Sequence, residues 1–291
     1  MGYHGESMSV TKSSSVAQNA SSSDWAPPSI VAAVAALCRS VIAHRELIGI
    51  LVAKNLKLRY RGSLLGFCWT LLNPLLLMLV YTLVFSVYFR LDMDKYPAFL
   101  FSGLLPWIWF SSSLQQGVTC ILDGAGLVTR SRFPAEVLPV VALTANTVNF
   151  LLTLPLLFVF LLAFHVTLGP PVLVLPVLIG LQYLLTLGPV LILAPANVHF
   201  RDLQHIILHL LTVGQFLTPI FYPASLIPES LRPWAFLNPL AVLFGAFQDV
   251  LYFNRLPPWP PLLGLLALAI VILVVSAAVF ARYQKTFAEA L

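Results

Sequence analysis

The segment PLLGLLALAIVILVVSAAVF, residues 261–280, contains no charged side chain. An α-helix rises 1.5 Å per residue, so about twenty apolar residues are needed to cross the roughly 30 Å hydrocarbon core of a bilayer. Because no charge interrupts the run over that length, the segment predicts a membrane-spanning helix.

The composition of the whole chain points the same way. Of the 291 residues, 59% are hydrophobic and only 9% are charged, whereas soluble domains are typically about 45–50% apolar and about 25% charged. A water-soluble globular protein is therefore excluded. Strands of a membrane barrel would alternate apolar and polar residues over about ten positions, and this chain sustains no such alternation. We expect an all-α integral membrane protein.

Further apolar stretches of similar length predict six transmembrane helices, none of which contains Asp, Glu, Lys or Arg. The expected spans cover about residues 69–88, 98–118, 139–165, 172–197, 206–221 and 261–280. With a cytoplasmic amino end, twelve of the 16 basic residues fall on the inner side and four on the outer side. The positive-inside rule thus predicts that both termini are cytoplasmic.

The segments around the spans divide the chain further. Residues 1–30 are rich in serine and lack the apolar core of a signal peptide, so we expect a disordered cytoplasmic tail. Residues 31–61 are apolar but carry many charges, which predicts an amphipathic helix in the membrane interface. The transmembrane domain is expected over 62–284, and residues 285–291 form a cytoplasmic C-terminus.

The segment 222–260, between the fifth and sixth expected spans, is mostly apolar and repeatedly interrupted by proline. Such a segment is too apolar for a free loop and too broken for a regular span. Two short re-entrant or interfacial helices fit this pattern if they pack against protein. A seventh and an eighth crossing are the alternative.

The expected spans contain few groups that could use an ion gradient. His209 is the deepest titratable residue, and it is either a proton relay or an interfacial histidine. No Gly-Lys-Ser/Thr sequence is present, so a Walker phosphate cradle is missing from the chain. We therefore expect no cofactor in this chain, and the three cysteines have no metal-binding spacing. Energy must then arrive through contacts with another protein, at the charged inner segments 122–139 and 197–203, which could instead be solvated turns.

Five short motifs give a family resemblance. KNLKLRYRGSLLGFCW at 54–69, followed by Asn73-Pro74, resembles the start of the first span in type-2 ABC transporter permeases. These permeases export O-antigen, capsule and teichoic-acid polysaccharides. RFPAEVLP at 132–139 and FRDL at 200–203 resemble the inner segments of that family. TPIFYP at 218–223 and LNPL at 237–240 resemble its outer gate region.

The resemblance implies a homodimer in the bacterial inner membrane, paired with two copies of a separate ABC ATP-binding subunit that holds ATP and Mg. It implies an interface helix at about 40–61, a coupling helix at about 122–136 and short gate helices at about 223–250. The expected cargo is a polysaccharide on an undecaprenyl-type lipid, which would pass between the two subunits. Membrane lipid is a further expected partner, and nucleic acid is not one.

Four groups of residues are candidates for parts of this mechanism. Basic residues that could contact lipid phosphate, or merely anchor anionic lipids, are Lys54, Lys57, Arg59 and Arg61. Candidates for coupling to the ATPase are Arg130, Arg132, Glu136, Arg201 and Asp202, and we also expect an ion pair between the last two. Aromatic residues that could line a sugar channel, or form an ordinary interfacial belt, are Trp107, Trp109, Phe110, Phe216, Phe221 and Tyr222. Gly62 and Gly66 are candidate hinge residues in a small-xxx-small pattern.

Other function classes fit less well. A membrane-embedded glycosyltransferase or acyltransferase needs a catalytic group of side chains, and the outer acids Asp92, Asp94, Glu229 and Asp249 have no evident partners. We therefore expect a transport subunit and not an enzyme. An ABC exporter of a drug or small lipid is the closer alternative.

Overall fold

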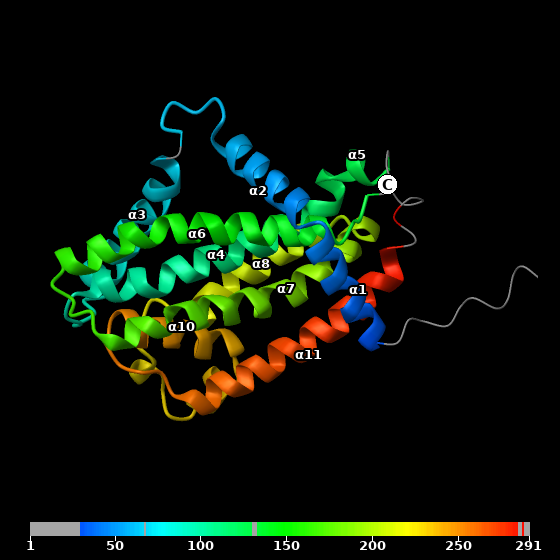
Figure 1. Ribbon diagram of the computed structural model, residues 1–291. Helices are drawn as coiled ribbons and strands as arrows, with labels where there is room; N and C mark the ends of the chain where they lie inside the picture. The colour runs from blue at the N-terminus through cyan, green and yellow to red at the C-terminus, as the bar shows by residue number, and fades with distance from the viewer. Residues whose placement is uncertain (1–29, 67, 130–132, 285–286, 288–291) are drawn as a thin grey trace, which may run out of the picture.

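The computed structural model describes residues 30–66, 68–129, 133–284 and 287. Every regular element in these residues is a helix, and the long helices lie roughly alongside one another (Figure 1). The elements that form this bundle are α3 (Cys68–Thr82), η1 (Leu83–Tyr88), α4 (Tyr96–Asp123), α6 (Val137–Ala163), η2 (Pro170–Val174), α7 (Leu175–His199), α8 (Leu203–Leu217) and α11 (Trp259–Tyr283).

Among the described residues, four segments are long and apolar enough to cross a membrane, namely Cys68–Tyr88, Val137–Ala163, Pro170–His199 and Trp259–Tyr283. This confirms the expected multi-pass membrane protein. The two remaining expected spans correspond to α4, which has 28 residues but carries serines and glutamines, and to α8. With 15 residues α8 extends only about 22 Å, less than the hydrocarbon thickness. Crossing by these two helices stays a prediction.

The centre of the bundle is α4, which packs against α3, α6, α7, α8 and α10. Its side chains Phe99, Phe101 and Leu104 are completely buried. α7 packs against both α4 and α11, and the backbones of α7 and α11 approach closely at Gly188. A Cβ atom there would lie 2.6 Å from Ile272 Cγ2 and 3.2 Å from the backbone nitrogen of Leu273. Small residues of this kind allow membrane helices to pack tightly.

A π-helical turn, η1, ends the first long helix. The backbone N–H of Phe89 bonds to the carbonyl of Val84 at 3.0 Å, which is an i to i−5 bond. The wide turn places the ring of Phe85 against that of Phe221, with centroids 5.2 Å apart and planes 5° from parallel. π-Bulges often occur at functional sites.

Two helices, not one, occupy the expected interface segment. α1 (Ile30–Ala43) packs on α11, and α2 (Arg45–Tyr60) packs on α6. They are separated at His44, which has φ −104° and ψ 20° and whose Nδ1 lies 2.9 Å from the carbonyl of Ser40. α2 buries Ile48 and Val52 against the bundle.

The segment between α8 and α11 contains the turn η3 (Ala224–Leu226) and the short helices α9 (Arg232–Leu237) and α10 (Pro239–Leu251). The Asn238 side chain caps α10 by accepting the N–H of Leu240 at 3.0 Å. α10 buries Phe244 and Phe247 completely in the core. A gate formed by these helices stays a prediction.

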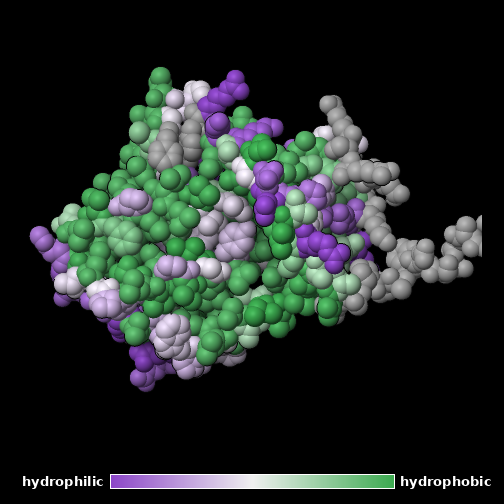
Figure 2. All heavy atoms as spheres, viewed as in Figure 1, coloured by the Kyte–Doolittle hydropathy of each residue, from purple (hydrophilic) through white to green (hydrophobic). Residues whose placement is uncertain are grey.

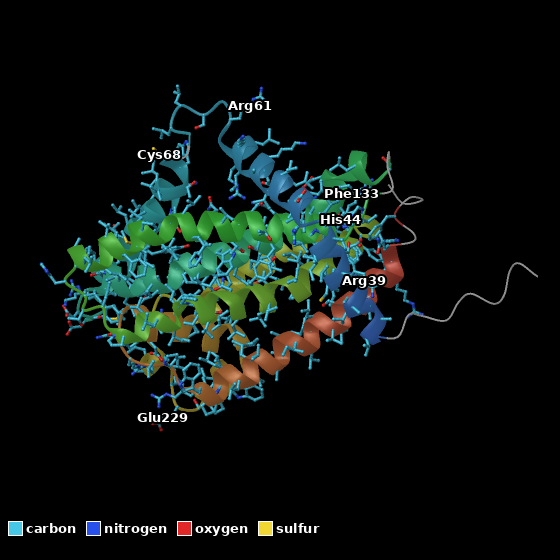
Figure 3. All side chains as sticks on the ribbon, viewed as in Figure 1. Arg39, His44, Arg61, Cys68, Phe133 and Glu229 are labelled. Atoms are coloured by element: carbon cyan, nitrogen blue, oxygen red, sulfur yellow. The ribbon has the colours of Figure 1, made fainter. Side chains whose placement is uncertain are left out.

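Polar residues mark the ends of the bundle. Hydrophobic residues dominate the middle of the visible face, and hydrophilic ones gather toward the ends and beside the loop after α2 (Figure 2). Arg39, His44 and Phe133 lie toward one end, here called the inner end, and Glu229 lies at the opposite, outer end (Figure 3). This arrangement is typical of helices whose connections lie in water on either side of a membrane.

Candidate functional site

The basic residues of α2 point in two directions. Lys54, Lys57 and Arg61 are exposed. Arg59 instead lies on the buried side with Ile48 and Val52, and its side chain is only partly exposed. The four basic residues therefore do not form a single patch.

The guanidinium of Arg59 joins α2 to α4 and α6. Its Nη2 donates hydrogen bonds of 2.8 Å to Gln116 Oε1 and 3.0 Å to Asn146 Oδ1. The Asn146 amide in turn donates to Gln116 Oε1 at 3.1 Å and to the backbone carbonyl of Ala142 at 2.9 Å. We call Arg59, Gln116 and Asn146 the Arg59 cluster.

The Arg59 cluster holds a positive charge with neutral acceptors. In the part of the chain that the structure describes, no carboxylate lies within 4.0 Å of the Arg59 guanidinium. Withdrawing a cation from water is costly unless a counter-charge or strong hydrogen bonds compensate it. A cavity of about 480 Å³, lined by Lys54, Asn55 and Gln116 among others, reaches Arg59 from the side of α2. The charge of Arg59 thus faces a cavity that is also lined by the carboxylate of Asp123.

The expected coupling residues lie at the inner end. Arg130 and Arg132 fall outside the described residues. Glu136, just before α6, accepts a 2.8 Å hydrogen bond from Gln284 Nε2 at the end of α11. α5 (Ala125–Val128) follows α4 directly and forms a single turn. The segment between α4 and α6 is thus tied to the C-terminal end of the bundle.

Arg201 and Asp202 are both exposed in the turn between α7 and α8. They form no ion pair with each other within the described residues, so the expected bridge is wrong. Neighbouring residues at a helix start point in different directions, which explains why the charges do not meet. Both side chains are available to a partner.

The six aromatic candidates separate by burial. Trp107, Trp109, Phe110 and Phe221 are buried within the subunit, whereas Phe216 is 50% exposed and Tyr222 is half-buried. The four buried rings pack against other core residues, such as Phe244 beside Trp107 and Phe150 beside Trp109. Phe216 and Tyr222 alone among the six offer substantial surface outside the subunit.

Gly62 and Gly66 lie in the loop between α2 and α3 and both have positive φ, at 80° and 48°. A left-handed conformation of this kind favours glycine. A Cβ at Gly62 would meet nothing within 4 Å, and one at Gly66 would meet only the Ser63 carbonyl at 4.0 Å. The two glycines thus serve backbone conformation in this loop and not helix packing.

The family comparison agrees with this architecture. The model of the ABC-2 type transporter family matches residues 46–252, which include α2 from its second residue, the Arg59 cluster and α10. The chain belongs to the ABC-2 type transporter family. As an ABC-2 type transporter it is a permease and not an enzyme.

Curated relatives of this ABC-2 transporter have similar lengths. An O-antigen export system permease protein RfbA of Myxococcus xanthus is 44% identical over 257 residues, which cover 88% of this chain and 99% of the relative. Two proteins of the same name from Klebsiella pneumoniae are 31% and 29% identical over 252 residues, covering 84% of this chain and 95% of each relative.

Sequence reasoning missed part of the Arg59 cluster of the ABC-2 transporter. Asn146 was not recognised, although an amide in an otherwise apolar span is itself a functional signal. Arg59 is grouped with Lys54, Lys57 and Arg61 as a candidate phosphate contact, but its spacing from Ile48 and Val52 places it on the buried face. His209, the expected deep titratable group, is exposed on α8.

Proposed function

We propose that this chain is the permease subunit of an ATP-driven exporter that moves lipid-linked O-antigen polysaccharide across the bacterial inner membrane. The observation that carries the proposal is the 44% identity with the Myxococcus xanthus permease over nearly the whole of that protein. Membership of the ABC-2 type transporter family supports an ABC ATP-binding partner, in which ATP and Mg would bind.

The proposed assembly is a homodimer with two ATP-binding subunits. The inner segments 122–136 and 197–203 would receive the motion of the ATPase, which the exposure of Arg201 and Asp202 supports. All six expected spans would cross the membrane, with both termini in the cytoplasm and α9 and α10 as gate helices. The polymer would pass between the two subunits, because hydrated sugars can cross hydrocarbon only along a path that protein side chains line.

Two surfaces of the subunit suit this cargo. Exposed Lys54, Lys57 and Arg61 on α2 would attract the phosphates of the carrier lipid. Phe216 and Tyr222 would offer aromatic faces to sugar C–H groups at the subunit surface. The buried aromatic candidates would support this surface from inside.

Deletion of the gene tests the proposal. The deletion strain should lose surface O-antigen and accumulate lipid-linked polymer inside the cell, and the wild-type gene should restore export. A strain that keeps its surface polysaccharide would contradict the proposed cargo. Restoration of drug resistance instead of surface polymer would favour a small-molecule exporter.

A further inference from the structure

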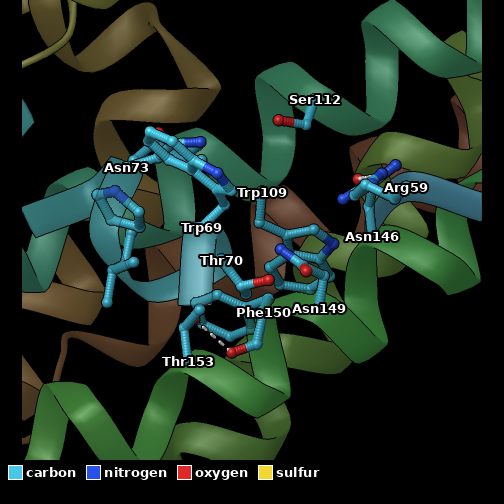
Figure 4. A pocket seen from close by; sticks show the side chains of 13 residues that line it. Arg59, Trp69, Thr70, Asn73, Trp109, Ser112, Asn146, Asn149, Phe150 and Thr153 are labelled. Carbon is cyan, nitrogen blue, oxygen red and sulfur yellow. Dashed lines mark hydrogen bonds between the residues drawn. The ribbon is translucent and has the colours of Figure 1, made fainter. Parts of the chain in front are cut away.

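A second cavity, of about 350 Å³, lies on the other side of Arg59 between α3, α4 and α6. Figure 4 shows Arg59 and Asn146 at one end of it, Trp69 and Asn73 at the other, and Trp109 and Asn149 between them. We call it the α3–α4–α6 cavity. Its volume lies in the range of about 300–1,000 Å³ that small-ligand pockets occupy.

The lining of this cavity combines polar and aromatic groups. Amides and hydroxyls come from Asn73, Ser112, Asn149 and Thr153, on three different helices. Flat apolar walls come from the indole rings of Trp69 and Trp109. Sugars have the same two kinds of surface, because hydroxyls surround a ring whose C–H faces are apolar.

The indole N–H of Trp109 is a hydrogen-bond donor for which the described residues supply no acceptor. Its side chain is 3% exposed and stacks on Phe150, with ring centroids 4.7 Å apart and planes 16° from parallel. Within the described residues its buried Nε1–H has no hydrogen-bond partner. Leaving a buried donor unpaired costs free energy. This nitrogen has almost no accessible surface in the empty cavity, so a ligand oxygen would recover that free energy only when the indole ring shifts toward it.

Arg59 supplies a charge at the end of the cavity. As described above, its partners are the neutral amides of Gln116 and Asn146. A guanidinium binds phosphate oxygens with paired hydrogen bonds and attracts them by its charge. A phosphate here would supply the counter-charge that the Arg59 cluster lacks.

We propose that the α3–α4–α6 cavity binds a sugar phosphate, with the phosphate on Arg59 and the sugar ring against Trp69 and Trp109. The Trp109 N–H and the amide of Asn73 contact the sugar hydroxyls. This inference rests on the proposed function, in which the head of the lipid-linked polymer carries this chemistry. The cavity thus recognises the junction between the carrier lipid and the polymer. It is a separate site from the exposed basic residues Lys54, Lys57 and Arg61.

Titration of the complete exporter tests the site. The permease with its ATP-binding subunit is placed in phosphatidylcholine nanodiscs and titrated by calorimetry with glucose 1-phosphate, glucose and inorganic phosphate. Glucose 1-phosphate should bind at least about tenfold more tightly than either fragment, because it uses both ends of the cavity. Equal affinities of inorganic phosphate and glucose 1-phosphate would overturn the sugar part of the proposal.

Paired variants locate the binding. Arg59→Gln should weaken glucose 1-phosphate binding by about tenfold or more, as expected for a lost charged hydrogen bond, whereas Arg45→Gln, an exposed charge on the same helix, should not. Trp109→Phe keeps the stacking ring but removes the N–H, and should weaken binding several-fold, whereas Trp259→Phe at the start of α11 should not. Unchanged binding in Arg59→Gln would overturn the proposal.

A further variant separates a local role from misfolding. Asn146→Asp places a carboxylate against Arg59 at nearly constant volume, so it should weaken the binding of glucose 1-phosphate and spare that of glucose, whose proposed contacts are Trp69, Trp109 and Asn73. Equal loss of both ligands would contradict the charge-based site. Complete loss of glucose 1-phosphate binding when phosphatidylglycerol is added would show that a phospholipid headgroup is the occupant, and would overturn the sugar assignment.

The export assay keeps this inference distinct from the proposed function. If the inference fails, Arg59→Gln leaves glucose 1-phosphate binding intact in a protein whose deletion still abolishes surface O-antigen. If the proposed function fails, the deletion strain itself keeps its surface polysaccharide.

Discussion

The hydroxyl of Tyr96, at the start of α4, donates a 2.8 Å hydrogen bond to the backbone carbonyl of Phe221, 125 residues further along the chain. The Phe221 ring also contacts Tyr81 and Phe85, with centroid distances of 4.6 Å and 5.2 Å. These contacts fasten the outer ends of α3 and α4 to the segment that follows α8.

We expect Tyr96→Phe to lower the stability of the protein by about 1 kcal/mol, because the Phe221 carbonyl loses its partner while the ring stays. Thermal unfolding in detergent measures this change. Tyr222→Phe is the control, since its hydroxyl donates to the Phe216 carbonyl from an exposed position. An equal decrease in unfolding temperature in both variants would show that the buried hydrogen bond of Tyr96 contributes no more than the exposed one of Tyr222.

The ion pair of Arg255 with Asp249 should matter more than a surface pair. Arg255 Nε donates a 2.8 Å hydrogen bond to Asp249 Oδ1, and Nη2 lies 2.6 Å from the same oxygen. Asp249 is 9% exposed. Arg255→Leu leaves a buried carboxylate unpaired and should cost about 1–3 kcal/mol.

A double-mutant cycle checks this expectation. Adding Asp249→Asn to Arg255→Leu should recover part of the loss, because a neutral amide needs no counter-charge. Arg232→Leu removes the 3.9 Å pair with the exposed Glu229 and should cost less than about 0.5 kcal/mol. An additive cycle would contradict the predicted coupling.

Gly188→Ala should destabilise the packing of α7 on α11 by about 1–3 kcal/mol, because the new methyl group meets backbone that cannot move aside. Gly180→Ala on the same helix is the control, since nothing lies within 4 Å of its Cβ. That variant should be neutral or slightly stabilising. The midpoint of thermal unfolding distinguishes the two, and equal midpoints would refute the close approach.

The inner turns should touch the ATP-binding subunit. After the exposed Cys38 and Cys68 are changed to serine, a cysteine introduced by Arg130→Cys or Asp202→Cys should crosslink to that subunit. Glu229→Cys at the outer end should not. Crosslinking from residue 229 in place of residue 202 would reverse the proposed orientation.

The sequence predicts the helical class well because the bilayer imposes it. An uncharged run such as 261–280 has few alternatives to a spanning helix, and α11 covers it. Side-chain direction was harder to predict. The sequence around Trp107 and Phe221 does not indicate whether these side chains line a channel or lie in the core, because aromatic residues are common in both places.

The Arg59 cluster shows a second limit. Its three members are far apart in the chain, and only the packing of α2 on α6, and of α6 on α4, brings them together. Helical periodicity indicates that Arg59 turns inward, but it does not identify Gln116 or Asn146 as its partners. The break at His44 was likewise not predicted, because neither proline nor glycine marks it.

The π-helical turn η1 fixes how many residues this part of the chain can contain. Each residue of a helix advances the next side chain by about 100°, so deleting Val84, directly before Phe85, would swing the Phe85 ring away from Phe221. Insertions and deletions should therefore be tolerated in the loop before α4 and rejected one turn earlier.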